Sequence, residues 1–132
     1  MLTKLYGIME DNPNSDPAFR DTKEILRRLI SNASVSKTKV LQNYPNPFNP
    51  ETWIPFQLSE ASEVEIKIYN PAGQLIKALD LGYRNAGYYE SQEDSARWDG
   101  TNESGEKVAS GLYFYTLRAG EYTATRRMLL IK

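Results

Sequence analysis

The chain has 132 residues, a formal net charge of −1 and neither cysteine nor histidine. This length accommodates one domain with a single core plus an appendage. The two missing residue types exclude thiol nucleophiles, His-containing catalytic triads and the usual zinc sites. The balanced charge gives no sign of nucleic-acid binding, and no apolar run approaches the length of a membrane span.

The N-terminal part has a helical pattern. Residues 2–10 place Leu2, Leu5 and Met9 at helical spacing, and Asp16-Pro17 is typical of a helix start. We expect residues 1–30 to form a helical connector of two short helices and residues 31–43 to be a linker. The N-terminus lacks the apolar stretch and cleavage site of a signal peptide, which favours the tail of a longer chain with its leader far upstream.

From residue 44 onwards the pattern is that of strands. The prolines at 45, 47 and 50 predict a stiff, extended lead-in, anchored by Tyr44 and Phe48. Turn signals recur between short apolar segments, which predicts an antiparallel β-sandwich of about seven strands. The predicted strands are 52–58 (with Pro55 marking an edge or a bulge), 63–69, 74–81, 87–92, 96–99, 111–119 and 121–131.

Alternation along these strands predicts the core. The side chains expected to be buried are Trp53, Phe56, Leu58, Val64, Ile66, Ile68, Leu75, Leu79, Trp98, Tyr113, Tyr115, Leu117, Leu129 and Ile131.

The stretch from Trp98 to Tyr115 combines a loop of glycine and short polar residues with a tyrosine-rich strand. Its side chains suit turn-stabilising hydrogen bonds to nearby backbone amides, so we expect a rigid connection rather than a catalytic centre. Asp99, Asn102 and Glu103 are weak calcium candidates, because oxygen ligands in such a loop suit that cation. Their spacing is not diagnostic, so turn capping is preferred, and no metal or other cofactor is expected.

Two further surface readings remain open. Tyr113, Tyr115 and Tyr122 could form an aromatic platform for a sugar, although core packing is the default for residues at this spacing. Arg126-Arg127 and Lys132 are either a contact patch for a partner or edge-strand charge that blocks aggregation.

A family resemblance rests on an ordered set of motifs within residues 44–132. These are the lead-in Tyr44–Pro50, Ile68–Gln74, Trp98-Asp99-Gly100, Ser110–Tyr115 and the final Met128–Lys132. The set resembles the type A C-terminal immunoglobulin-like sorting domains of the type IX (Por) secretion system. It is similar too to the immunoglobulin-like domain of the flagellar hook-capping protein.

The resemblance implies an immunoglobulin-like sandwich that serves as the non-catalytic tail of an exported protein of a Gram-negative bacterium. Such tails are recognised in the periplasm by the secretion machinery and directed to the cell surface. A sortase-like peptidase then cleaves ahead of the tail, here within 31–43. The recognition residues implied by the motifs are Pro45, Asn46, Pro47, Gly111, Tyr113 and Lys132.

An alternative is a structural or adhesive immunoglobulin-like module, such as a carbohydrate-binding accessory, in an extracellular multidomain protein. A small hydrolase is not supported, because no paired-carboxylate geometry is evident. Unpaired sheet edges make a homodimer plausible, and an upstream domain of the same polypeptide is a further expected partner.

Overall fold

The computed structural model describes residues 35–132, and the expected helical connector lies outside the described residues. The described part contains strands and no helix. The strands are β1 (Lys39–Val40), β2 (Thr52–Ile54), β3 (Phe56–Leu58), β4 (Ser62–Tyr69), β5 (Leu75–Arg84), β6 (Gly87–Tyr89), β7 (Ala96–Trp98), β8 (Gly111–Ala119) and β9 (Tyr122–Leu130).

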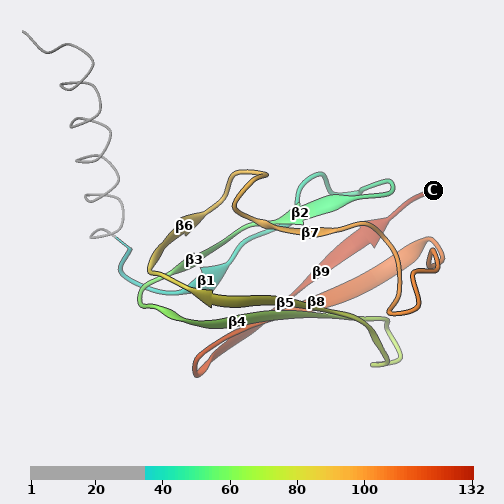
Figure 1. Cartoon of the computed structure of the whole chain (residues 1–132). Coiled ribbons are helices and arrows are strands. Elements are labelled where there is room, and N and C mark those ends of the chain that lie inside the picture. The colour runs from blue at the N-terminus through green and yellow to red at the C-terminus, as the bar shows by residue number, and fades with distance from the viewer. Residues whose placement is uncertain (1–34) are drawn as a thin grey trace, which may run out of the picture. The chain divides into compact units, whose positions relative to one another are not determined.

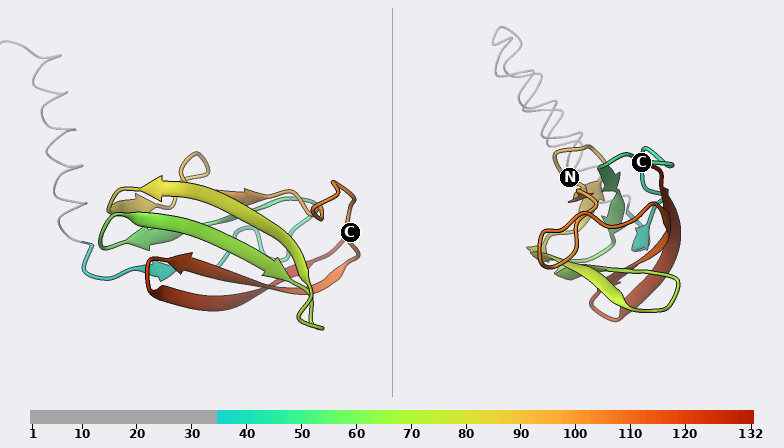
Figure 2. Two further views of the ribbon diagram at one scale, coloured as in Figure 1. Left: turned by 60° about the horizontal axis from the view of Figure 1, so that its bottom comes forward. Right: turned by 90° about the vertical axis from the view of Figure 1, so that its right-hand side faces the viewer.

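The strands form two layers (Figure 1). One layer is a four-stranded sheet in the order β5-β4-β8-β9, and Figure 2 (left) shows its outer face. The other layer consists of the sheet β1-β3-β6 and the pair β2-β7. All pairings between these strands are antiparallel. The expectation of a mainly-β, immunoglobulin-like antiparallel sandwich is thus confirmed.

Local signals account for several boundaries. Pro55, which has no N–H to donate, separates β2 from β3. The amide of Gly73 donates to the Asn70 carbonyl in the predicted turn, at 2.9 Å. Gly120 has a φ of +61° in the tight connection between β8 and β9, as expected.

The β unit starts before residue 44. Its first strand, β1, lies within residues 31–43, which we expected to be a linker, and it pairs with β3. Val40 in this strand is 2% exposed. A strand of two residues has no periodicity that a sequence pattern could detect.

The core lies between the two layers. Val64, Ile66 and Ile68 are buried on alternate positions of β4, as predicted. The largest fully buried side chains are Trp98, Tyr115, Phe48, Phe56, Ile54, Leu58, Ile66, Ile68, Leu117, Met128, Leu130 and Val64.

Four core predictions were wrong and one was partly right. Leu129 and Ile131 are exposed at 37% and 49%, because Met128 and Leu130 point inward instead. Leu75 is 48% exposed at the start of β5, and Trp53 is only half-buried, whereas its neighbour Ile54 is fully buried. Leu79 is partly buried against the core. The side-chain period of a strand is two residues, so a one-residue error exchanges the two faces.

Both edges of the four-stranded sheet meet other parts of the chain. At β9, Arg126 Nε donates to the Val40 carbonyl at 3.0 Å. The side-chain Nε2 of Gln42 donates to the Arg127 carbonyl, also at 3.0 Å. At β5, the Glu103 carboxylate accepts from the Ala78 amide at 2.6 Å. The Arg127 carbonyl and the Ala78 amide are therefore not available to a further strand.

Candidate functional site

The proline-rich lead-in pairs with the end of β9. The Phe48 amide donates to the Leu129 carbonyl at 3.0 Å, and the Ile131 amide donates to the Phe48 carbonyl at 3.0 Å. The side-chain oxygen of Asn46 accepts from the Leu129 amide at 3.0 Å. We call this contact between residues 46–48 and 129–131 the seam. It joins the first and the last motif of the resemblance into one structural element (Figure 1).

An aromatic anchor holds the lead-in in place. Phe48 is 2% exposed and its ring lies 5.6 Å from that of Trp98, which in turn meets Tyr113 edge-on at 5.4 Å. Aromatic pairs at such distances add to the stabilisation that burial provides. Phe48 is therefore an anchor, as predicted. The X–Pro bonds before Pro45, Pro47 and Pro50 are cis.

A buried polar cluster fixes the start of the lead-in. Asn43, 2% exposed, donates to the Thr52 hydroxyl at 3.0 Å and to the Pro45 carbonyl at 3.3 Å. Thr52, which is fully buried, donates to the same carbonyl at 3.0 Å. Sequence reasoning missed both Asn43 and Thr52. Their only sequence signal is that two polar residues flank a proline-rich segment.

Tyr115 connects β8 to the chain just before the lead-in. Its hydroxyl donates to the Leu41 carbonyl at 2.7 Å and accepts from the Asn43 amide at 2.9 Å. The ring is fully buried, and burial raises the pKa of the Tyr115 hydroxyl to about 12. A single side chain of one layer thus satisfies two backbone groups that no strand partner reaches.

Side-chain hydrogen bonds hold the loop after β7, of the turn-stabilising kind that the sequence predicted. The Trp98 indole donates to the Thr101 carbonyl at 2.9 Å, and the Asp99 carboxylate accepts from the Thr101 hydroxyl at 2.6 Å. The hydrogen bond from the Thr101 hydroxyl is the main reason why the pKa of the Asp99 carboxyl is lowered. Gly100 has a φ of +78°, and a Cβ there would lie 2.9 Å from the Pro50 carbonyl oxygen. Only glycine allows the loop to approach the lead-in so closely.

The calcium candidates are engaged in other contacts. The Asn102 side-chain oxygen accepts from the amides of Ser104 and Glu106, both at 3.0 Å, and Glu103 binds the Ala78 amide. The Asp99 carboxylate accepts hydrogen bonds from the amide and the hydroxyl of Thr101. Across residues 35–132, no group of three or more Asp or Glu side chains is placed to hold a metal ion.

The recognition residues implied by the resemblance fall into two groups. Five of them, from the lead-in, the start of β8 and the chain end, lie at or beside the seam: Pro45, Asn46, Pro47, Gly111 and Lys132. Gly111 is paired with Leu130, and the Lys132 amide donates to the Ser110 hydroxyl at 3.0 Å. Tyr113 differs, because it is 6% exposed and its hydroxyl donates to the Ala109 carbonyl at 2.6 Å.

The tyrosines do not form a sugar platform. Tyr113 and Tyr115 are buried in the core, as the default reading predicted. Tyr122 is half-buried, and its hydroxyl accepts from the Val40 amide at 3.3 Å.

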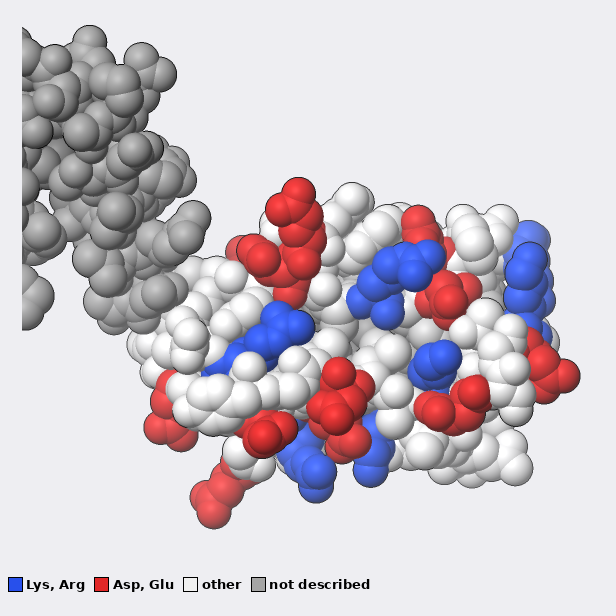
Figure 3. All heavy atoms as spheres, in the orientation of Figure 1, with Lys and Arg blue, Asp and Glu red and all other residues white. Residues whose placement is uncertain are grey.

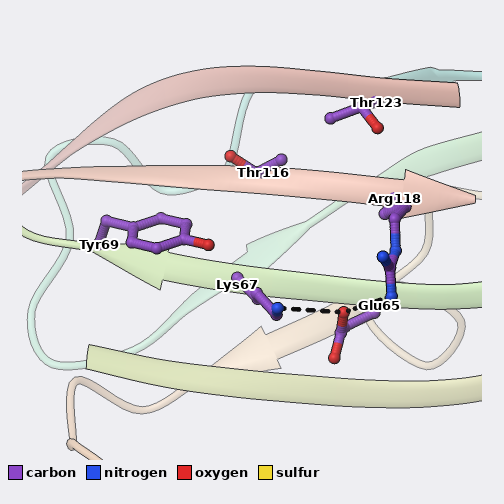
Figure 4. A pocket seen from close by; sticks show the side chains of 6 residues that line it. All are labelled: Glu65, Lys67, Tyr69, Thr116, Arg118 and Thr123. Carbon is purple, nitrogen blue, oxygen red and sulfur yellow. Dashed lines mark hydrogen bonds and ion pairs between the residues drawn. The ribbon is translucent and has the colours of Figure 1, made fainter. Parts of the chain in front are cut away.

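A hollow lies on the outer face of the four-stranded sheet. Its volume is about 200 Å³, and Figure 4 shows the six residues that line it: Glu65, Lys67, Tyr69, Thr116, Arg118 and Thr123. Glu65 forms ion pairs with Lys67 at 3.8 Å and with Arg118 at 3.3 Å. The hollow shares no residue with the seam. Sequence reasoning did not single it out.

No helix within the described part of the chain is long and apolar enough to cross a membrane.

Three solved structures are similar to parts of the chain, each at low sequence identity. The dimeric latent PorU of Porphyromonas gingivalis is 17% identical, with a TM-score of 0.53, over 74% of this chain and 10% of PorU. PorZ, a surface component of the type IX secretion system of P. gingivalis, is 19% identical, with a TM-score of 0.47, over 77% of this chain and 12% of PorZ. FlgD from P. aeruginosa is 20% identical, with a TM-score of 0.46, over 71% of this chain and 66% of FlgD.

The chain therefore spans only a small part of PorU and PorZ, and the likeness to PorU concerns the fold. No curated protein matches the sequence. The model of the FlgD Ig-like domain family matches residues 49–124, which run from the end of the lead-in into β9. This match covers more than half of the chain and most of the sandwich described above. The chain belongs to the FlgD Ig-like domain family.

Proposed function

We propose that this immunoglobulin-like domain is a non-catalytic sorting and surface-attachment module of a larger exported bacterial protein. In this proposal the secretion machinery reads the folded domain at the seam, and the cargo lies upstream in the same polypeptide. A sortase-like peptidase would cut within residues 31–43, ahead of the lead-in. The domain would pass through the periplasm to the cell surface or the extracellular space.

The seam is the observation that supports this proposal. The motifs that carry the resemblance to sorting domains stand at opposite ends of residues 44–132, yet Asn46 and Phe48 bind the backbone of residues 129–131. A receptor that contacts the end of β9 would therefore contact the lead-in as well. Because the seam forms only in the folded domain, a receptor that reads it would select chains in which this domain has folded.

The test is an export assay in a host with a working type IX system. Residues 31–132 are fused behind a signal peptide and a fluorescent passenger, and surface fluorescence is measured. We expect the fusion to reach the surface and the passenger alone to remain in the periplasm. Asn46→Ala, which removes the side-chain contact to the Leu129 amide, should lower display about fivefold or more if the machinery reads the seam.

Asn70→Ala is the matched control. Asn70 also accepts a hydrogen bond from a backbone amide, that of Gln74 at 2.9 Å, but it lies in the turn between β4 and β5. This variant should be displayed like the unmodified domain. Periplasmic retention of the unmodified fusion, while a known sorting domain exports the same passenger, would refute the sorting function. Equal display of both variants would refute the role of the seam.

A further inference from the structure

Long and short side chains stand side by side on the outer face of the four-stranded sheet. Strand register places the outward residues in three rows across β4, β8 and β9. The rows are Tyr69–Phe114–Arg127, Lys67–Thr116–Thr125 and Glu65–Arg118–Thr123. Threonine is short, so the floor of this face is lower than its surroundings, and hollows result.

A second hollow adjoins the one shown in Figure 4. Its volume is about 340 Å³, and it is lined by Gln42, Phe114, Thr125, Arg126 and Arg127. The hydroxyls of Thr116 and Thr125 lie 2.7 Å apart, and each belongs to one of the two hollows. The two hollows therefore meet at this threonine pair, and together they form what we call the threonine face.

Positive charge is unbalanced only at the second hollow of the threonine face, which Arg126 and Arg127 line without any carboxylate. In the first hollow Glu65 stands with Lys67 and Arg118, and the hollow beside it adds the carboxylates of Glu63 and Asp80. Arg126 reaches the second hollow from the edge of β9, since its strand partner Tyr115 points inward. Lys67 and Arg118 both pair with Glu65, whereas no carboxylate of residues 35–132 lies within ion-pair distance of Arg126 or Arg127. The Val40 carbonyl holds Arg126 Nε in place, so the guanidinium is positioned before any ligand arrives.

This surplus is local. Elsewhere, on the side of the molecule seen in Figure 3, acidic and basic side chains are interspersed. The whole chain has a net charge of −1. Mixed surface charges give little long-range attraction. A negatively charged ligand is therefore attracted only at short range, by the arginines of β9.

The backbone and the aromatic side chains indicate the class of ligand. β8 is paired on both sides, with β4 and with β9, so this face offers no free backbone groups to an added peptide strand. Recognition must use side chains. Tyr69 and Phe114 are half-buried and present ring surface beside the threonine hydroxyls. Ring surface packs against the apolar C–H face of a pyranose, while hydroxyls and guanidinium groups bind polar and anionic substituents.

We propose that the threonine face binds an anionic polysaccharide. Phe114 packs against a sugar ring, Thr116 and Thr125 exchange hydrogen bonds with its hydroxyls, and Arg126 and Arg127 bind its carboxylate or sulfate groups. This binding is independent of the export function proposed above.

The test measures binding of the full chain by affinity electrophoresis in gels that contain one polymer each. The polymers are polygalacturonate, chondroitin sulfate, neutral galactan and poly-L-glutamate. We expect retardation by at least one of the two acidic polysaccharides, no retardation by galactan, and release at high salt. Comparing the carboxylated with the sulfated polymer identifies the preferred anionic group.

Arg127→Gln should weaken binding about tenfold, since it removes one charge-assisted contact. Lys107→Gln removes the same charge from an exposed loop position away from the face and should leave binding unchanged. Melting curves establish that both variants are folded. Absence of retardation by both acidic polysaccharides would overturn the proposal. So would poly-L-glutamate binding as tightly as the polysaccharides, or an Arg127→Gln variant that binds like the unmodified chain.

Discussion

Leu130→Ala should lower the free energy of unfolding by about 2–5 kcal/mol, the usual cost of truncating a buried leucine. Leu130 is 1% exposed, pairs with Gly111 in the sheet and lies beside Phe48 at the seam. Its removal leaves a cavity where the last strand, the lead-in and the core meet. Urea denaturation followed by tryptophan fluorescence measures the change.

The neighbouring leucine is the matched control. Leu129 is 37% exposed and stands opposite Leu112, which is also exposed, on the outer face of β9. Leu129→Ala should change the free energy of unfolding by no more than about 1 kcal/mol. If Leu129→Ala were the more damaging of the two substitutions, β9 would face the core with the opposite set of side chains.

Tyr115→Phe should lower the free energy of unfolding by about 2–3 kcal/mol, although it removes a single oxygen atom. The hydroxyl donates a hydrogen bond to the Leu41 carbonyl and accepts one from the Asn43 amide. The substitution leaves both backbone groups without this partner. Each buried polar group left without a partner costs about 1–3 kcal/mol. Tyr83→Phe removes the same atom from a side chain that is 65% exposed and should change stability by less than about 0.5 kcal/mol.

The same residue predicts a pH dependence. Burial raises the pKa of the Tyr115 hydroxyl in the folded protein to about 12, whereas the pKa of a tyrosine in the unfolded chain is about 10. Between these two pH values the folded protein keeps the proton and the unfolded chain loses it. The stabilisation is therefore fully present below about pH 10 and is lost as pH rises towards about 12. Tyr115→Phe should flatten the fall of stability over this range. An identical slope in both proteins would mean that the hydroxyl is not buried.

Elements with local signals could be predicted from the sequence. In β4, strict alternation of apolar and charged residues fixed the inward face, and the Asn70–Gly73 turn followed from proline and glycine at their preferred positions. Pro55 predicted an interruption, which the structure places between β2 and β3.

Elements that depend on distant partners could not be predicted. The end of β9 is a run of Met128, Leu129, Leu130 and Ile131 without alternation, so the sequence alone does not determine which residues point inward. The structure resolves this ambiguity through Phe48, whose backbone aligns residues 129–131.

The same reason limits prediction of the site. Asn46 and Leu129 are separated by 83 positions, and no local pattern links an asparagine between prolines to a strand amide near the chain end. The threonine face likewise arises from register between β4, β8 and β9, in which each strand contributes three outward residues that form no motif of their own.

Amide hydrogen exchange at Phe48 and Ile131 tests the seam most directly. Both amides donate to carbonyls across the seam, so we predict protection comparable to that of the Leu117 amide in the central strand β8, and faster exchange at both positions together in Asn46→Ala. Exchange of Phe48 and Ile131 at the rate of unstructured peptide, while Leu117 stays protected, would contradict the pairing of the lead-in with the last strand. The seam could then not serve as a single recognition element.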